Sequence, residues 1–130
     1  MLSDLNNRTE YYPKAIYDAI HLLHDLYDIK CPIYITENGT YFEGTEPVGE
    51  DGIVHDDDRI RYVAGFLEWL EKAIDEGYDV RGYYLWSLMD NFEWSAGYNF
   101  KFGIMSCDRE GNTAWKKSAH FYKDFIKAHK

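Results

Sequence analysis

The order of sequence patterns predicts an α/β fold with parallel strands. Three segments with apolar residues at helical spacing alternate with two short apolar runs that are typical of buried strands. This alternation favours parallel strands joined by right-handed crossovers. The chain has 130 residues, 45% of them hydrophobic and 28% charged, which indicates a globular protein and not a disordered one. We therefore expect residues 1–130 to form a single domain.

The first helix is expected to follow Pro13, since a proline in the first turn loses no helical hydrogen bond. Its apolar stripe comprises Ile16, Ile20, Leu23 and Tyr27. The apolar run 33–35 then predicts a buried strand, which ends in a turn at 38–39. Residues 40–57 are rich in glycine and acidic residues, and we expect them to form a loop.

The second helix is expected to have Asp57 or Asp58 as its cap and to end near Gly77. Its apolar stripe comprises Ile60, Val63, Ala64, Leu67, Leu70 and Ile74. Residues 80–86 are aromatic and apolar, which predicts a second buried strand.

A long loop is expected at about residues 87–113, followed by a third helix that starts near Thr113. The apolar face of this helix would comprise Trp115, Ala119, Tyr122 and Ile126.

Parallel α/β folds bind ligands beyond the carboxyl ends of their strands. Glu37 follows the first predicted strand, and the second leads into Trp86, Glu93 and Trp94. Indole rings stack on the C–H faces of sugars, and carboxylates accept hydrogen bonds from adjacent hydroxyls. A carboxylate can also be the nucleophile of a retaining glycosidase. The pattern alone leaves two other interpretations open: a solvated acid at Glu37, and tryptophans that belong to the core.

The exact strings at these places are more specific. Residues 34–39 read YITENG, which resembles the nucleophile motif of family 1 glycoside hydrolases, the β-glucosidase family. Residues 85–94 read LWSLMDNFEW, and with the following residues 97–104 they resemble the sugar-binding signature of that family. Shorter similarities at 54–60 and 117–119 make the match collinear over nearly the whole chain.

The resemblance implies a partial (β/α)8 TIM barrel: the last two β/α units, strands seven and eight, plus a preceding helix. It assigns the nucleophile to Glu37 and a supporting contact with that nucleophile to Asn38. It assigns sugar contacts to Trp86, Glu93, Trp94 and Phe102. No cofactor and no metal is implied.

The implied reaction is the retaining hydrolysis of terminal non-reducing β-D-glucosides. An unphosphorylated sugar is implied, because the Glu93 carboxylate would repel a phosphate dianion. Phe100 and Phe102 also stand where the related 6-phospho-glycosidases carry a lysine and a tyrosine. Glu37, where thioglucosidases have glutamine, implies an O-glycoside. The residues do not distinguish a glucoside from a galactoside or a fucoside.

The acid/base motif of the family, Thr-x-Asn-Glu-Pro, does not occur in this sequence. We therefore expect a C-terminal fragment that provides the nucleophile and lacks the acid/base. Such a fragment could be completed by a complementary N-terminal barrel chain or by self-association. The alternative is a catalytically inactive fragment that binds sugar or a partner chain.

Composition disfavours several other classes. A net charge of -9 opposes binding to nucleic acid, and no apolar run reaches the roughly 18 residues of a membrane span. Two cysteines are too few for a disulfide scaffold, which favours a cytoplasmic location. His21 and His24 lie three residues apart, and His55 is in an acidic loop, but this spacing is weak evidence for a metal site.

Overall fold

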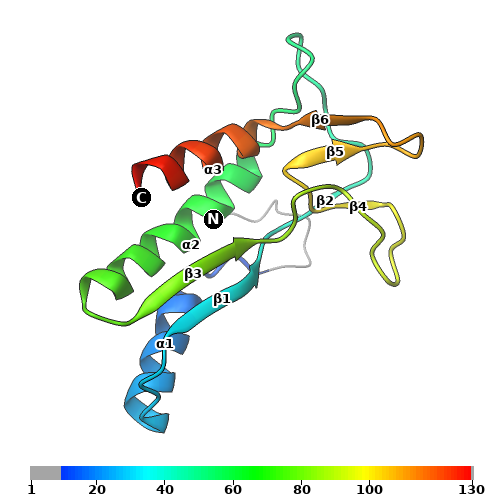
Figure 1. The fold of residues 1–130 in the computed structure, drawn as a ribbon. Coiled ribbons are helices and arrows are strands. Elements are labelled where there is room, and N and C mark those ends of the chain that lie inside the picture. Colours follow the sequence, from blue (N-terminus) through cyan, green and yellow to red (C-terminus); the bar gives the residue numbers. More distant parts are fainter. Residues whose placement is uncertain (1–9, 130) are drawn as a thin grey trace. The chain divides into compact units, whose positions relative to one another are not determined.

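A computed structural model of the chain describes residues 10–129 (Figure 1). The chain divides into two compact units. Of the described residues, 10–38 and 61–85 form the first unit, and 39–60 and 86–129 form the second.

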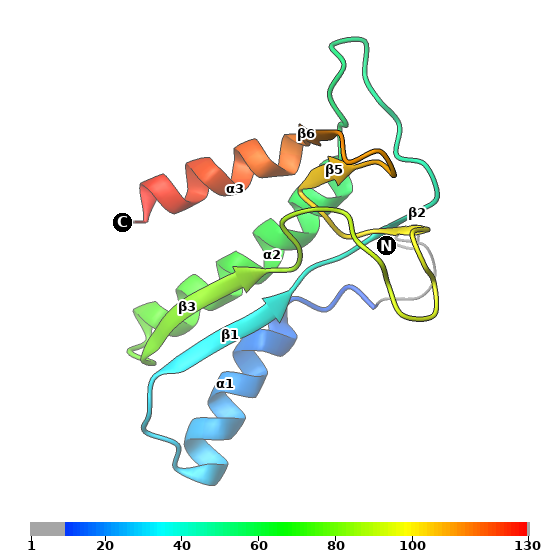
Figure 2. The same cartoon turned by 45° about the vertical axis from the view of Figure 1, so that its right-hand side comes forward.

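The first unit is built on two parallel strands, β1 (Ile33–Asn38) and β3 (Val80–Leu85) (Figures 1 and 2). Ile33 pairs with Val80 and Asn38 with Leu85, with two register shifts between these pairs. The predicted parallel arrangement is confirmed. The first strand extends three residues beyond the apolar run 33–35, because hydrogen bonding along a strand continues where hydrophobicity ends.

Helix α1 (Lys14–Tyr27) and most of helix α2 (Asp57–Asp75) complete the first unit. Its core contains Ile20, Leu70 and Ala73, all nearly inaccessible to solvent. Apolar residues of both strands pack against this core: Ile33, Ile35, Val80 and Tyr83. Tyr34 and Tyr84 are more than half exposed, which agrees with the alternation of side chains along a strand.

The start and end of α1 and the end of α2 agree with the sequence, whereas the start of α2 differs from the expectation. Helix α1 begins directly after Pro13, and Asp28, with a φ of 50°, ends it by donating its N–H to the carbonyl of Leu23. Asp57 and Asp58 lie in the first turn of α2 and not in the expected cap position. In the first turn their negative charges still interact favourably with the positive end of the helix dipole. Gly77 follows α2 with a φ of 97°.

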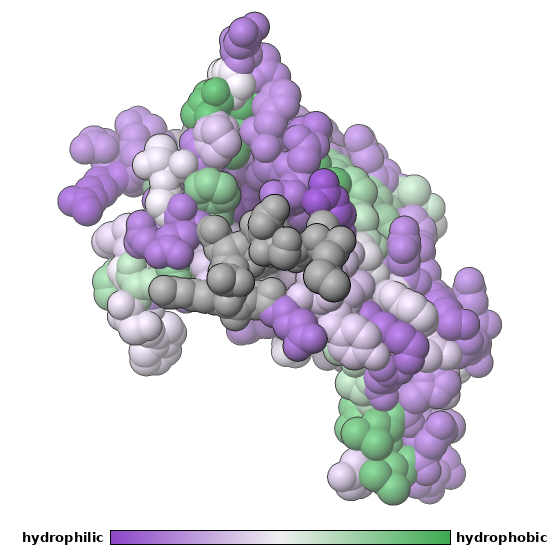
Figure 3. Space-filling view, turned by 180° about the vertical axis from the view of Figure 1, so that it is seen from behind, coloured by the Kyte–Doolittle hydropathy of each residue, from purple (hydrophilic) through white to green (hydrophobic). Residues whose placement is uncertain are grey.

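The stripe predicted for α1 is only partly buried. Ile20 is 2% exposed, whereas Leu23 and Tyr27 are 40% and 62% exposed. Figure 3 shows a hydrophobic patch over the C-terminal end of this helix. Leu22 and Leu26 add to the exposed apolar surface of that end.

The second unit contains four short strands. β2 (Phe42–Glu43) pairs antiparallel with β4 (Phe100–Lys101), and β5 (Met105–Cys107) pairs antiparallel with β6 (Thr113–Trp115). The two segments expected to be loops, 40–57 and 87–113, therefore contain strands of two or three residues. Strands this short carry too few residues to show a period of two in the sequence.

The expected start of the third helix is wrong. Helix α3 spans Lys117–Ala128, and Thr113–Trp115 is a strand. The reason is the turn before it, where the Asp108 carboxylate accepts N–H bonds of 3.0 and 2.7 Å from Glu110 and Asn112. This turn folds β6 back on β5, and Trp115 lies half exposed on β6 instead of on the helix.

Within residues 10–129, no helix is both long enough and apolar enough to cross a membrane. Cys31 and Cys107 are both free thiols.

Candidate active site

Glu37 and Asn38 are the last two residues of β1, in the first unit. The side chain of Glu37 is exposed. The hydroxyl of Tyr83 donates a hydrogen bond of 2.7 Å to the side-chain oxygen of Asn38. Burial raises the pKa of Tyr62, and a hydrogen bond with the Asn38 side chain acts in the opposite direction. The two tyrosines therefore fix the orientation of Asn38.

Trp86, Glu93, Trp94 and Phe102 all belong to the second unit. The residue that follows β1, Gly39, also belongs to it and lies against the backbone of Trp86. A Cβ atom added to Gly39 would be 1.9 Å from the carbonyl oxygen of Trp86, so only glycine fits here. The peptide bond between Trp86 and Ser87 is cis.

Backbone hydrogen bonds place Phe102 beside the residues that follow Trp86. The N–H of Ser87 donates to the carbonyl of Phe102 at 3.2 Å, and the N–H of Ile104 donates to the carbonyl of Ser87 at 3.0 Å. Trp86 is 39% exposed. Two of the predicted sugar contacts thus lie on neighbouring segments.

Glu93 and Trp94 lie in a tight turn that closes between Glu93 and Gly97. The N–H of Glu93 donates to the carbonyl of Gly97 at 2.7 Å, and the reverse bond measures 2.6 Å. The Trp94 side chain is 95% exposed. The Oε1 atom of Glu93 is buried and has no hydrogen-bond partner among the described residues.

An aromatic cluster of Tyr41, Phe100 and Phe102 lies in the same unit. The rings of Tyr41 and Phe100 are stacked, with centroids 4.2 Å apart and planes 14° apart. The Tyr41 and Phe102 rings are tilted, with centroids 5.1 Å apart. Tyr41 was not among the predicted site residues, because a lone tyrosine in a loop carries no periodic signal.

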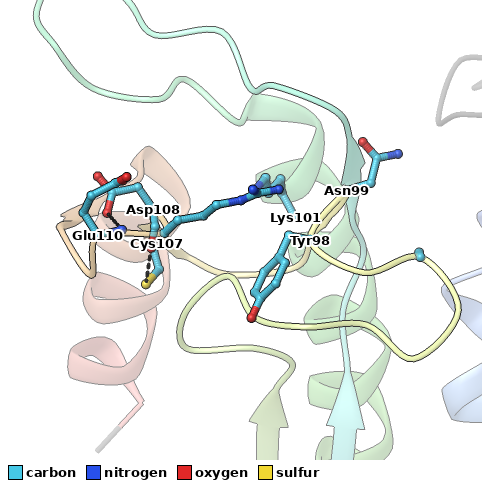
Figure 4. Close-up of a pocket in the computed structure, with 8 residues that line it drawn as sticks. Tyr98, Asn99, Lys101, Cys107, Asp108 and Glu110 are labelled. Carbon is cyan, nitrogen blue, oxygen red and sulfur yellow. Dashed lines mark hydrogen bonds between the residues drawn. The ribbon is translucent and has the colours of Figure 1, made fainter.

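The second unit has two pockets whose linings contain none of the predicted site residues. One, of about 580 Å³, has Tyr98 and Lys101 on one side and Cys107, Asp108 and Glu110 on the other (Figure 4). The other, of about 560 Å³, is mostly apolar, and its lining includes Leu88, Ile104, Trp115, Tyr122 and Ile126. Neither pocket combines an acid with an indole, whereas Glu93 and Trp94 are adjacent in one turn.

The histidines considered for a metal site contact other side chains. The ring of His21 lies 2.8 Å from the hydroxyl of Tyr78 and 3.2 Å from the carboxylate of Glu76. His24 contacts Asp25, and His55 contacts Asp51. The described part of the chain contains no group of three or more histidine, cysteine, aspartate or glutamate residues that could hold a metal ion.

A family model, curated proteins and solved structures similar to this chain all belong to one family. Residues 1–130 match the model of glycosyl hydrolase family 1. The chain is 46% identical over 120 residues to a bifunctional β-D-glucosidase/β-D-fucosidase of Bifidobacterium breve, covering 90% of this chain and 26% of that protein. It is 45% identical to a 6-phospho-β-galactosidase of Leptotrichia buccalis, covering 86% of this chain and 24% of that protein.

Among solved structures, a family 1 β-glucosidase of Thermotoga maritima in complex with isofagomine lactam is similar, with a TM-score of 0.84 and 39% identity. The match covers 91% of this chain and 26% of that structure. The chain therefore spans about a quarter of the length of the relatives it matches.

Proposed function

The chain belongs to glycosyl hydrolase family 1, and on this basis we propose that it contributes to the retaining hydrolysis of terminal non-reducing β-D-glucosides. In this proposal the chain supplies the nucleophile and part of the sugar site. Its strands β1 and β3 would correspond to strands seven and eight of the TIM barrel of the family.

Glu37 is the proposed nucleophile. Its exposed carboxylate, at the carboxyl end of a parallel strand, would attack the anomeric carbon and form a glycosyl-enzyme as the leaving group departs with the bonding electrons. Water would then hydrolyse this ester and regenerate the carboxylate with net retention. The sequence has no Thr-x-Asn-Glu-Pro string, so another chain segment would have to protonate the leaving group.

The single observation that carries the proposal is the unpartnered Oε1 atom of Glu93. A buried acceptor without a donor costs about 1–3 kcal/mol, and a sugar hydroxyl is a donor that could remove this cost. The next residue, Trp94, is almost fully exposed and offers an indole N–H and a flat ring. An acid and an indole at one turn are the groups that bind a sugar through its hydroxyls.

An unphosphorylated sugar is proposed on the basis of the aromatic cluster. Tyr41, Phe100 and Phe102 provide no cation for a phosphate, and the Glu93 carboxylate would repel a dianion. The relatives do not distinguish a phosphorylated from an unphosphorylated sugar, since one is a β-D-glucosidase/β-D-fucosidase and another is a 6-phospho-β-galactosidase. Binding of a sugar or a partner chain without turnover is the alternative.

Mass spectrometry of the intact chain tests the nucleophile. After incubation with 2,4-dinitrophenyl 2-deoxy-2-fluoro-β-glucoside, whose leaving group needs little acid assistance, we expect a mass gain of one fluoroglucosyl group. The Glu37→Gln variant should show no gain, and Glu50→Gln, a change at an exposed loop glutamate, should react like the unchanged chain.

The same incubation is repeated with a separately supplied polypeptide that corresponds to the part of the family the chain does not span. A Glu37-dependent adduct only in this mixture would support a role that requires a complementary chain. No adduct in either incubation would contradict the proposed nucleophile. Binding of glucose measured in the same samples would then favour the non-catalytic alternative.

A further inference from the structure

A buried network of charged side chains connects distant parts of the second unit. Lys116 is 0% exposed, and its ammonium group pairs with Glu46 and lies 2.9 and 3.0 Å from the carboxylate oxygens of Asp90. Arg59 is 4% exposed, donates two hydrogen bonds of 3.1 Å to Glu46, and pairs with Asp56. We call Arg59, Glu46, Lys116 and Asp90 the buried charge network.

Stability alone is a weak explanation for such a network. Removing charges from water costs free energy that pairing recovers only in part, and apolar side chains of similar volume are often as stable. What paired buried charges provide is defined geometry, because each ion must meet its partners at fixed distances and directions. The relevant question is therefore which segments the network fixes.

The network holds both ends of the segment that carries three of the four proposed sugar contacts, Glu93, Trp94 and Phe102. We call residues 91–102 the sugar-binding segment. Before it, Asp90 meets Lys116 and also accepts a hydrogen bond of 2.8 Å from the N–H of Gly103, directly after it. Near its end, Arg59 donates to the carbonyl of Lys101. The segment is thus anchored at its two ends by side chains from elsewhere in the chain.

Between these ends several large side chains of the segment are exposed to solvent. Phe92, Trp94 and Tyr98 are 59%, 95% and 55% exposed. Its backbone is also restrained by the turn between Glu93 and Gly97, by the two-residue pairing of β4 with β2, and by hydrogen bonds that the N–H groups of Gly44 and Ser87 donate to the carbonyls of Asn99 and Phe102. Because these large side chains gain little from burial, anchors at the two ends contribute to a defined position of the segment.

We infer that the buried charge network positions the sugar-binding segment, so that Glu93, Trp94 and Phe102 are held ready for a sugar. The network residues do not contact the sugar themselves; they act through the segment. This inference rests on the proposed function for the identity of the ligand, but the positioning itself can be measured without a ligand.

The test requires a variant that removes the ion pairs of Lys116 from the network without leaving unpaired charges. Lys116→Met alone leaves the carboxylates of Glu46 and Asp90 without their shared cation. This variant would therefore change the stability of the fold as well as the position of the sugar-binding segment. The triple variant Glu46→Gln, Asp90→Asn, Lys116→Met neutralises all three, and Arg59 keeps its pair with Asp56. The matched control makes the same substitution types at three exposed positions of the second unit: Glu50→Gln, Asp124→Asn, Lys127→Met.

Three quantities are compared in the full chain: the Tm, the hydrogen–deuterium exchange of backbone amides, and the Kd for isofagomine lactam. We expect the triple variant to keep a Tm close to that of the unchanged chain. Amides of the sugar-binding segment should exchange at least about tenfold faster, while those of β5 and β6 are unchanged. The Kd should rise about tenfold or more, because a displaced binding group loses its contacts. The control triple should change none of these quantities.

The outcomes separate the two proposals. A triple variant that exchanges and binds like the unchanged chain overturns the inference. Faster exchange throughout the second unit with a lower Tm also overturns it, since that result indicates a general structural role. If the unchanged chain binds no isofagomine lactam, alone or with the remaining family segment supplied, the proposed function fails, and amide exchange alone decides whether the network positions the segment.

Discussion

At Gly39 the close approach of a neighbouring backbone leaves no room for a side chain. A Cβ atom at this position would meet the carbonyl oxygen of Trp86 at 1.9 Å and its carbonyl carbon at 2.9 Å. At Gly82, by contrast, the nearest atoms belong to the ring of Tyr34, 2.5 Å away, and that side chain is 51% exposed. A backbone neighbour cannot rotate away, whereas a half-exposed ring can.

We therefore predict that Gly39→Ala destabilises the chain by about 2–3 kcal/mol, in the range for overpacking. Gly82→Ala, the control, should cost clearly less because the Tyr34 ring can move. Urea unfolding of both variants, followed by tryptophan fluorescence, measures the difference. Equal losses for the two variants would contradict the role given to the Trp86 backbone.

At the scale of elements, Glu76 connects the two helices of the first unit. It follows α2, and its carboxylate accepts hydrogen bonds of 2.7 Å from Lys72 on α2 and from Tyr17 on α1. These bonds, the Lys72 bond first, lower the pKa of Glu76 from 4.5 to about 2. The carboxylate form is therefore favoured by folding.

The sign of the pH dependence follows from this lowered pKa. The stabilisation from Glu76 is complete above pH 4.5, where the unfolded carboxyl is already ionised, and is lost as the pH falls towards 2. We predict that the stability difference between the unchanged chain and Glu76→Gln is largest above pH 5 and shrinks between about pH 4.5 and 2. Urea midpoints measured across this range provide the test.

The control for this measurement is Glu68→Gln, which removes one carboxylate from an exposed position on helix α2. Subtracting its effect corrects for the change in net charge. A Glu76→Gln difference that is constant from pH 6 to pH 2 would contradict the role of the interhelix hydrogen bonds.

At the scale of the whole molecule, exposed aromatic side chains coexist with a high net charge. Tyr34, Tyr84 and Trp94 are at least half exposed, and the net charge is -9 at pH 7. Charge repulsion opposes contact between copies of such a chain, and it disappears near the isoelectric point, about 4.9. Large exposed apolar groups then favour association.

We predict that the chain associates much more strongly at pH 5 than at pH 7.5. Sedimentation velocity at both pH values, with matched ionic strength, measures the distribution of species. Raising the salt concentration at pH 7.5 serves as a control, because screening should also increase association. A chain with the same monodisperse profile at both pH values and at high salt would contradict this prediction.

The sequence by itself determined the two long helices, the two parallel strands and the membership of glycosyl hydrolase family 1. Helices α1 and α2 span several turns, and their apolar period is long enough to be read locally. The family strings at residues 34–39 and 85–94 also require no folding to be recognised. The roles of Glu37, Asn38, Trp86, Glu93, Trp94 and Phe102 remain predictions that the trapping and binding experiments test.

Only the tertiary structure decided the features that depend on residues far apart in the sequence. The strand at Thr113–Trp115 forms because β5 pairs with it, although local spacing favoured a helix there. Lys116 and Arg59 look like ordinary surface cations in the sequence, yet they are buried because Glu46, Asp90 and Asp56 neutralise them. Long-range pairing of charges and strands has no period along the chain, so only folding reveals it.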